Sequence, residues 1–450
     1  MSTTSDHADP LRRQRLRRRP LGRYRYVRLR WRILFAVVDA VGAALFAAAR
    51  RLAKTFAPRV RREDSAGHDV RTVLLVQLDH LGDAVLTTAV LPALRRHYPA
   101  ASIEVLCGEP GREVFAAAPE VDRVHVARVH RFVRGRLRRF AWLGAAVWWG
   151  LALRRRKIDL AVDVRGDFSV AVILWLAGAR RRLGWAAGGG GFLLTDSAEF
   201  VAHRPEVESR AALLKVLGVD ARSGEEPLRP RLTPSETARR RVADWLDELA
   251  AAQPGEGPRV VMHVGAGTPA KAWPARHWEE LIGRLIVAEG ARVILCGGRA
   301  DCATAERILG RRGWPGVADW TGRLTIDELG ALIEQSDVLV GADSGPAHLA
   351  AAVDTPVVVL FSGTNHAEQW QPCGRVVRVL RRPVDCSPCH RHRCPVRGHP
   401  CMTELAPVRV AAEVTSVIEH ANHTASSGAA CGPRQTDVID DVQSPTRSQR

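Results

Sequence analysis

The sequence predicts an α/β protein with two Rossmann-like halves that face each other across a cleft. Between residues 71 and 423, short apolar runs bounded by turn residues alternate with segments of helical periodicity. This alternation is typical of doubly wound parallel sheets that are covered on both faces. A stretch rich in Arg and Pro at 221–235 divides it into two halves. At 450 residues, the chain is long enough for two or three domains of ~150 residues.

The first 70 residues are strongly basic. They hold 17 Arg and Lys against 6 Asp and Glu, while the whole chain has a net charge of +18. Residues 1–27 lack apolar periodicity, so we expect a disordered basic arm. Residues 28–70 predict an amphipathic helix followed by a polar linker.

The apolar part of this helix, Ile33 to Ala49, is interrupted by Asp39. It is shorter than the ~20 apolar residues that a membrane-spanning helix needs. An Arg-flanked helix that lies on the membrane surface fits better. A helix packed on the protein's own surface and a true membrane span are the alternatives.

A second basic segment, 131–157, contains nine Arg and Lys, no acidic residue and several Phe and Trp. Interleaved aromatic and basic residues suit single-stranded nucleic acid and a bilayer interface equally well. With the N-terminal helix, this segment leads us to expect an anionic membrane surface as partner, and no nucleic acid. We see no signal peptide, and nine cysteines in so long a chain do not predict a disulfide scaffold. The expected location is cytoplasmic, at the inner face of the cell membrane.

The first half, residues 71–235, opens with a strand at 73–78, and Gly82 and Asp83 follow at the start of a helix. Further strands are expected at 102–107, 121–126 and 159–164. Open α/β sheets bind ligands at the carboxyl ends of their strands, so Asp83 would face the cleft. It could act there as a general base towards a hydroxyl group, or only cap the helix.

The second half, residues 236–423, has predicted strands at 259–263, 291–296, 317–318, 338–340 and 357–361. After the first of these, Gly265 and Thr268 belong to a run of small residues that leaves room for a ligand. Lys271 in the same loop could supply a mobile cation to a phosphate, or be an ordinary solvated lysine.

The strand at 338–340 leads through a turn into a short helix over 345–353. Asp343 and Ser344 are good cap residues, and Gly345 lets the backbone approach a ligand closely. The N-terminus of the helix then favours an anion such as a diphosphate. The alternative is an ordinary capped corner in which His348 merely packs. From residue 424 the composition predicts a disordered tail.

Three ordered motifs resemble glycosyltransferase family 9, the ADP-heptose:lipopolysaccharide heptosyltransferase family. They are Leu-Gly-Asp at 81–83 with Thr-Thr at 87–88, Lys-Ala-Trp-Pro at 271–274, and Asp-Ser-Gly-Pro-Ala-His-Leu at 343–349 with Thr-Pro at 355–356. The resemblance covers residues 71–415. The basic N-terminal segment and the tail lie outside it.

The resemblance implies a GT-B fold with an acceptor-binding N-terminal domain and a donor-binding C-terminal domain. It also implies sugar transfer with inversion at the anomeric carbon, without a metal ion or other required cofactor. Asp83 would be the catalytic base, and Asp79, His80 and Gly82 would line the acceptor side of the cleft. The residues that would bind the nucleotide-sugar donor are Lys271, Asp343, Ser344, Gly345, His348, Gly265 and Thr268.

The chain departs from the family pattern after two strands. Gln77, Asp79 and His80 stand where many members have a basic residue and two serines, and Val264 stands where a proline is frequent. These departures bear on donor and acceptor identity more than on the reaction class. Asp79 could also share the base role with Asp83, in which case the two carboxylates would titrate as a pair.

A cysteine cluster near the C-terminus has a spacing that suits zinc. Its members are Cys386, Cys389, Cys394 and Cys401. A structural zinc site is one interpretation, and reduced thiols or local disulfides are the others. We assign the cluster no catalytic role.

The sequence therefore predicts an inverting glycosyltransferase of lipopolysaccharide core or other envelope polysaccharide synthesis. It would move a heptose or similar sugar from an ADP-heptose-type donor to a lipid-linked or polysaccharide acceptor at the cytoplasmic membrane face. The alternatives are a nucleic-acid-binding α/β protein that uses the Arg-rich segments, and a catalytically silent relative that binds a nucleotide sugar.

Overall fold

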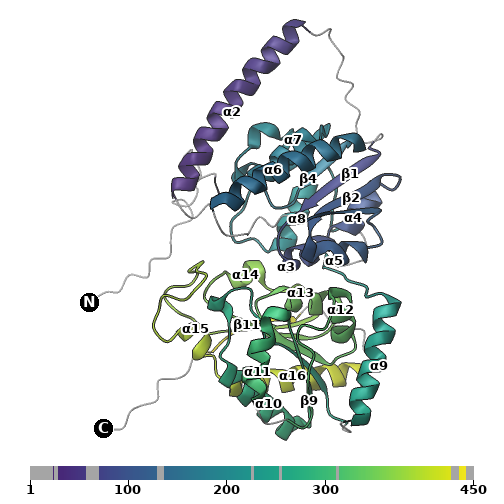
Figure 1. The fold of residues 1–450 in the computed structure, drawn as a ribbon, viewed down its shortest axis with the longest axis vertical. Coiled ribbons are helices and arrows are strands. Elements are labelled where there is room, and N and C mark those ends of the chain that lie inside the picture. Colours follow the sequence, from purple (N-terminus) through teal and green to yellow (C-terminus); the bar gives the residue numbers. More distant parts are fainter. Residues whose placement is uncertain are drawn as a thin grey trace, which may run out of the picture.

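The computed structural model describes residues 24, 29–56, 70–128, 136–223, 228–252, 256–310, 314–426 and 435–441. It shows two α/β halves, one above the other in Figure 1, with a long separate helix beside the first half. Most of the predicted basic arm and the linker at 57–69 lie outside the described residues.

The first half is built on a six-stranded parallel sheet with the order β3-β2-β1-β4-β5-β6. Its strands are β1 Thr72–Gln77, β2 Ser102–Gly108, β3 Arg123–Ala127, β4 Leu160–Asp163, β5 Arg181–Trp185 and β6 Asp196–Ala198. Its helices are α3 Leu81–Thr88, α4 Leu91–His97, α5 Arg112–Ala116, α6 Arg136–Leu153, α7 Phe168–Leu176 and α8 Glu206–Lys215.

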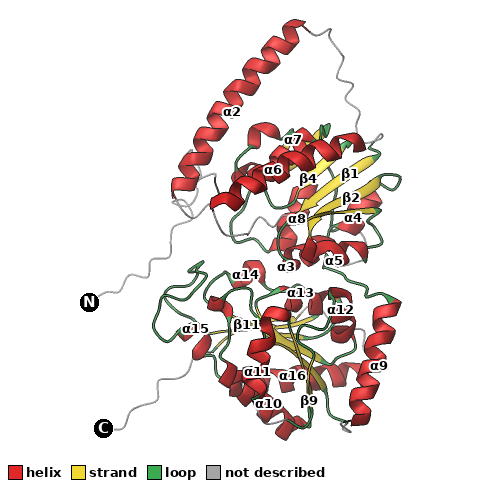
Figure 2. Ribbon diagram, in the orientation of Figure 1, coloured by secondary structure: helices red, strands yellow, loops and turns green. Residues whose placement is uncertain are grey.

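The second half is built on a seven-stranded parallel sheet with the order β13-β12-β11-β10-β7-β8-β9 (Figure 2). Its strands are β7 Arg259–His263, β8 Arg292–Cys296, β9 Val317–Asp319, β10 Val338–Ala342, β11 Val357–Phe361, β12 Val376–Arg381 and β13 Gln435–Asp440. Its helices are α9 Glu236–Ala252, α10 Ala275–Glu289, α11 Cys302–Leu309, α12 Ile326–Glu334, α13 Gly345–Ala352, α14 Ala367–Trp370, α15 Pro400–Thr403 and α16 Pro407–Ser426.

Side chains of β1 show why the central strands are apolar throughout. Val73 and Leu75 pack in the core formed with α3 and α4, whereas Leu74 and Val76 pack in the core formed with α6 and α7. A strand with helices on both faces must bury both sets of side chains, so the polar alternation of a half-exposed strand is absent. The predicted α/β class with two parallel sheets is therefore confirmed.

The helix expected in the N-terminal region is α2, Leu29–Phe56. It lies along the first half, beside α7 in Figure 1. Its stretch Leu29–Ala48 has a mean hydropathy of 1.8 and only 6% of it is buried. By length and composition alone this stretch could cross a membrane. It is longer than the apolar segment from Ile33 to Ala49 on which the sequence-based prediction of a surface helix rests.

The prediction of a disordered tail from residue 424 is wrong for 435–440. These residues form β13, which extends the second sheet beside β12 in parallel register. Asp437 pairs with Arg378 at 2.8 Å, and Asp440 pairs with Arg381 at 2.6 Å. The polar composition of this segment suggested disorder, but its Asp residues neutralise arginines of the neighbouring strand. Residues 427–434 and 442–450 lie outside the described part of the chain.

Candidate functional site

The two halves meet where α3 faces α13. Each of these helices begins just after the carboxyl end of a central strand, β1 for α3 and β10 for α13. A Cβ atom built on Gly82 would lie 2.7 Å from His348 Cδ2, and one built on Gly345 would lie 2.8 Å from Leu81 Cδ2. The first turns of both helices therefore touch where the halves meet. Helix N-termini offer free N–H groups and a positive dipole end, which favour an anion.

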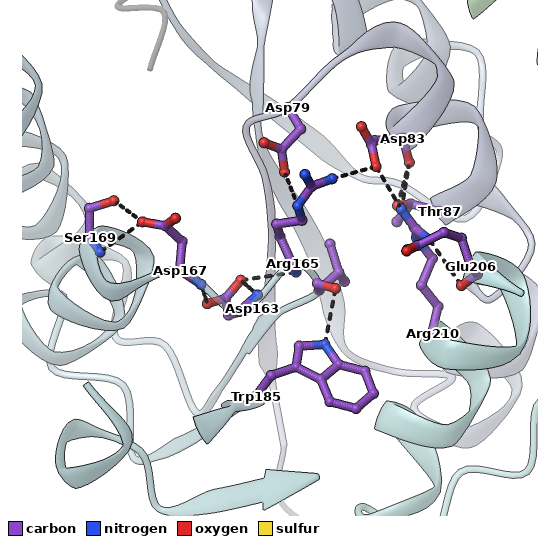
Figure 3. A network of polar contacts seen from close by, with 12 residues as sticks. Asp79, Asp83, Thr87, Asp163, Arg165, Asp167, Ser169, Trp185, Glu206 and Arg210 are labelled. Carbon is purple, nitrogen blue, oxygen red and sulfur yellow. Dashed lines mark hydrogen bonds and ion pairs between the residues drawn. The ribbon is translucent and has the colours of Figure 1, made fainter. Parts of the chain in front are cut away.

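Asp83 lies in the first turn of α3 and is 5% exposed. Its Oδ1 atom accepts hydrogen bonds from Arg165 Nη1 at 2.9 Å and from Arg210 Nη2 at 3.3 Å (Figure 3). Arg165 follows β4 and Arg210 lies in α8, so residues distant in sequence fix the direction of one carboxylate. Such charge-assisted bonds are short and strong.

Arg165 is the centre of this network. Its Nε atom also lies 3.5 Å from Asp79 Oδ2. Burial alone would lower the pKa of Arg165, but the nearby carboxylates of Asp79 and Asp83 outweigh it and raise the pKa. The guanidinium therefore stays charged and sits between the two carboxylates that sequence analysis placed in the cleft.

A buried aspartate that the sequence analysis missed holds the Arg165 turn. Asp163, at the end of β4, accepts backbone N–H bonds from Arg165 at 3.0 Å, Gly166 at 2.8 Å and Asp167 at 2.9 Å. Asp-x-Arg-Gly-Asp after an apolar strand was the available signal, because Asp and Gly favour tight turns. The turn directs Arg165 across the cleft, where its guanidinium carbon lies 5.7 Å from the ring centre of Trp370 in α14.

Arg210 is also held from several sides. Its Nη1 atom donates to Glu206 Oε2 at 2.8 Å, and its Nε atom donates to Thr87 Oγ1 at 3.0 Å. Glu206 in turn accepts a bond from Gln369 of the second half at 2.9 Å. The Asp83 environment is therefore completed by contacts between the halves.

On the side of the second half, Lys271 and Asp343 lie at the start of α13. Lys271 Nζ lies 2.5 Å from Asp343 Oδ2 and donates to the Asp343 carbonyl at 3.1 Å. Asn365 Nδ2 donates to the same carboxylate oxygen at 3.1 Å. Ser344 Oγ lies 3.3 Å from His263 Nδ1. The structure thus brings the predicted Lys271, Asp343 and Ser344 together at the N-terminus of α13.

His348 is buried in the contact between the halves. Burial lowers the pKa of His348 to about 4, although the negative charges of Asp343 and Asp83 act to raise it. Its ring is therefore neutral near pH 7, and Nδ1 has no hydrogen-bond partner among the described residues. Because both aspartates act on the His348 ring, Asp83 of the first half and Asp343 of the second half both lie near it.

The remaining predicted residues lie in three different parts of the structure. Gly265 and Thr268 both lie in the loop after β7, and Thr268 Oγ1 is buried without a partner among the described residues. His80 is exposed at the start of α3. The four cysteines are free, and the described residues contain no group of three or more His, Cys, Asp or Glu side chains placed to hold a metal ion. The zinc interpretation of the cysteine cluster stays a prediction.

Asp301 is a second carboxylate that the sequence analysis missed. A Cβ atom on Gly265 would lie 2.4 Å from Asp301 Oδ2, and the same oxygen accepts the Gly298 N–H at 2.8 Å. Asp301 thus stands at the carboxyl end of β8, next to the loop of Lys271. An acidic residue after the second strand of a Rossmann half is the signal that was available.

Two parallel α/β halves that meet through α3 and α13, with Asp83 on one side and Lys271 on the other, fit the GT-B class of glycosyltransferases. Comparison with known proteins agrees. Residues 149–399 match glycosyltransferase family 9 (heptosyltransferase). The chain belongs to this family.

Among curated relatives, lipopolysaccharide heptosyltransferase 3 of Escherichia coli is 30% identical over 301 residues, which cover 65% of this chain and 83% of the relative. Lipopolysaccharide heptosyltransferase 1 of Pseudomonas aeruginosa is 28% identical over 374 residues, which cover 77% of this chain and 98% of the relative.

Solved structures show the same fold. The ADP-heptose lipopolysaccharide heptosyltransferase II of E. coli matches with a TM-score of 0.61 at 22% identity, over 78% of this chain and 99% of that one. A family 9 glycosyltransferase of Veillonella parvula matches with a TM-score of 0.64 at 17% identity, over 78% and 98%. The predicted GT-B fold is confirmed.

Proposed function

We propose that the chain transfers a heptose or similar sugar from an ADP-heptose-type donor to a hydroxyl group of a lipid-linked or polysaccharide acceptor. Transfer would invert the anomeric carbon and need no metal ion. The observation that carries the proposal is the contact of α3 with α13, which sets Asp83 opposite the Lys271–Asp343 pair with His348 between them. The names of the relatives supply the sugar and the lipopolysaccharide acceptor.

In this proposal Asp83 is the general base. Its carboxylate takes the proton of the acceptor hydroxyl while the hydroxyl oxygen bonds to the anomeric carbon. Arg165 and Arg210 both bind the same oxygen, Oδ1. The bonds leave Oδ2 as the atom available to the acceptor, and they hold the carboxylate in one orientation.

The other wall assists the leaving group. As the bond between the anomeric carbon and the phosphate oxygen breaks, the departing nucleoside diphosphate gains negative charge. Lys271 and the N–H groups at the start of α13 would stabilise that charge. Lys271 already pairs with Asp343, which holds the ammonium group in place before the donor arrives.

Asp301 extends the proposed donor site beyond the diphosphate. It lies at the carboxyl end of β8, the neighbour of β7, next to Gly265. A carboxylate in this position of a Rossmann half can accept hydrogen bonds from ribose hydroxyls. The nucleotide would then run from α13 across the ends of β7 and β8.

Donor entry requires the halves to separate. Leu81 covers Gly345 at the start of α13, since a Cβ atom on Gly345 would meet the Leu81 side chain at 2.8 Å. A phosphate at these N–H groups would displace Leu81. Opening for the donor and closing for transfer would also exclude water from the reacting centre.

The proposed location of the protein is the cytoplasmic face of the cell membrane, to which it would be peripherally attached. A lipid-linked acceptor requires access to that surface. The basic and apolar helix α2 supports this location, because Arg-flanked apolar helices bind at the boundary of headgroups and acyl chains.

The experiment measures ADP release from ADP-heptose with a heptose-deficient lipopolysaccharide core as acceptor. Asp83→Asn should lower kcat by ~10²–10⁴-fold while the donor Kd stays unchanged. Lys271→Ala should instead weaken donor binding by ~10-fold or more, as read by calorimetry. Asp244→Asn, at an exposed aspartate of α9, is the control.

Two results would oppose the proposal. Full turnover by the Asp83→Asn variant would remove the base assignment. Donor binding by the unmodified chain without transfer to any core acceptor would favour a catalytically silent relative. Asp79→Asn decides whether Asp79 shares the base role, because only shared proton transfer makes its loss comparable to that of Asp83.

A further inference from the structure

A buried aspartate fastens α2 to the first half. Asp39 lies in the middle of the helix and is only 7% exposed. Its Oδ1 atom accepts the backbone N–H of Gly190 at 2.7 Å, and its Oδ2 atom accepts the hydroxyl of Tyr24 at 2.7 Å. Asp39 is the only acidic residue of α2. A buried carboxylate with these bonds costs much less than one without them.

The surface of the first half that contacts α2 fits the helix closely. A Cβ atom on Gly42 would lie 2.3 Å from Phe192 Cζ, so only glycine lets the helix approach this ring. On the other side of the contact, Gly189 has φ +84°, and a Cβ atom there would lie 2.4 Å from Phe35 Cδ1. Phe46 completes the contact, with its ring centre 5.6 Å from that of Phe192. The glycine-rich loop at 188–191 therefore receives α2.

The opposite face of α2 is apolar and exposed. Its large hydrophobic residues, each between 45% and 65% exposed, are Leu29, Ile33, Leu34, Val37, Val41 and Leu45. Five of them recur every four residues and so form one stripe along the helix. Arg30 and Arg51 are exposed near the two ends of this face. We call these six apolar residues the outer stripe.

We propose that α2 is an interfacial helix that docks the protein on an anionic lipid bilayer through the outer stripe, while Asp39 keeps the helix flat on the first half. This inference rests on the proposed membrane location. The occupant is a lipid surface because an apolar stripe with Arg at its ends complements acyl chains and anionic headgroups together. A membrane-spanning α2 would instead take Asp39 away from Gly190 into hydrocarbon, where an unpaired carboxylate is costly.

The glycine-rich loop at 188–191 also connects the docked helix to the acceptor side of the proposed active site. A Cβ atom on Gly188 would lie 1.9 Å from the carbonyl oxygen of Gly166, so the glycine-rich loop packs directly on the Arg165 turn. Gly166 is held in that turn by Asp163. The loop thus lies between α2 and the residues that orient Asp83, which sets the membrane surface at a fixed position relative to the acceptor side of the cleft.

The first test compares binding of the full chain to vesicles of phosphatidylcholine with phosphatidylglycerol. Val37→Glu/Val41→Glu, in the outer stripe, should lower binding by ~10-fold or more in a flotation assay. Val287→Glu/Val408→Glu makes the same chemical change at exposed valines of α10 and α16 and should leave binding unchanged. Equal binding by the two double variants would overturn the proposal. So would conversion of a dimer to a monomer by Val37→Glu/Val41→Glu with vesicle binding intact, since the stripe would then face a second copy.

Transfer to a soluble, delipidated core acceptor separates this inference from the proposed function. The outer-stripe variant should retain the full rate on that acceptor and lose rate only on vesicle-bound acceptor. Loss of vesicle binding with no transfer by any form would contradict the function and leave the docking surface supported.

The second test distinguishes docking from spanning. Alkaline carbonate strips interfacial proteins from membranes but leaves spanning helices in place, so the full chain should appear in the soluble fraction. Retention in the membrane pellet would overturn the interfacial arrangement. Asp39→Leu, which removes the bonds to Gly190 and Tyr24, should increase proteolytic cleavage between α2 and the first half by several-fold. Unchanged cleavage would show that Asp39 does not fasten the helix.

Discussion

Arg165 binds Asp83 with an Nη1–Oδ1 distance of 2.9 Å, while its guanidinium carbon lies 5.7 Å from the ring centre of Trp370 in the opposite half. One side chain therefore contacts the proposed base and the donor-side half at once. If the halves moved apart, Arg165 would lose its contact with Trp370. Its bond to Asp83 could remain, because both residues belong to the first half. Arg165 is thus a positioning residue whose environment is complete only when the halves are closed.

Replacement of Arg165 by Met should lower kcat by ~100-fold with little change in donor KM, because a misplaced carboxylate costs transfer without touching the donor. Arg165→Lys should restore only part of the rate, since an ammonium group cannot bind Asp79 and Asp83 through a planar fork. Steady-state kinetics with varied donor separates the two parameters. A purely structural role would lower the amount of folded protein and leave kcat per folded molecule unchanged.

Closure should be sensitive to one methyl group at Gly82. A Cβ atom there would lie 2.7 Å from His348 Cδ2, and the buried ring has little room to move. We expect Gly82→Ala to hold the halves apart and to lower kcat by ~10-fold or more, while calorimetry shows normal donor binding. Gly144→Ala is the matched control, since nothing lies within 4 Å of a Cβ atom at that helical position. Normal turnover by Gly82→Ala would mean that this contact is not needed for transfer.

The sequence predicts the fold well because the relevant signals are local. Apolar runs mark β1, β2, β7, β8, β10 and β11, and their burial on both faces follows from the lack of polar alternation. β12 and β13 were missed, as was the short strand β6. Arg378 and Arg381 interrupt the apolar pattern of β12, and Asp437 and Asp440 make β13 resemble a polar tail until the two strands pair.

The site is only half predictable. Asp83, Lys271 and Asp343 stand at strand ends, where position in the chain indicates the cleft. Arg165 and Arg210 bind Asp83 from positions 82 and 127 residues away, which no local pattern reveals. That the glycine run at 188–191 contacts α2 depends on Asp39 and Phe35, which lie about 150 residues earlier in the chain.

Two buried histidines should make the second half sensitive to mild acid. Burial lowers the pKa of His263 and of His348 to about 4, below the 6.5 of an unfolded chain. Between those pH values the unfolded chain binds more protons, so stability is complete above 6.5 and falls as pH decreases towards 4. The loss should reach up to ~3 kcal/mol for each histidine.

Denaturant unfolding at several pH values between 4 and 7 measures this dependence. His263→Gln/His348→Gln should flatten the decline of the free energy of unfolding in that range. His97→Gln, at an exposed histidine of α4, should leave the slope unchanged. A decline as steep in the double variant as in the unmodified chain would place the acid sensitivity elsewhere.

Glu104 should stabilise the first half most strongly near neutral pH. This fully buried carboxylate of β2 lies 2.7 Å from His125 Nε2 and pairs with Arg156 at the end of the basic segment. Burial alone would raise the pKa of Glu104, but hydrogen bonds from His125 and Arg156 outweigh it and lower the pKa from 4.5 to about 2. A lowered carboxyl pKa contributes stability above 4.5 that is lost as pH falls towards 2, here ~3 kcal/mol.

Glu104→Gln keeps the shape of the side chain and removes its charge. We expect it to lower the free energy of unfolding by ~2–3 kcal/mol at pH 7, and the difference from the unmodified chain should shrink as pH approaches 2. Arg240→Gln breaks a highly exposed pair with Glu236 and should cost less than ~0.5 kcal/mol at any pH. A Glu104→Gln difference that stayed constant with pH would come from packing.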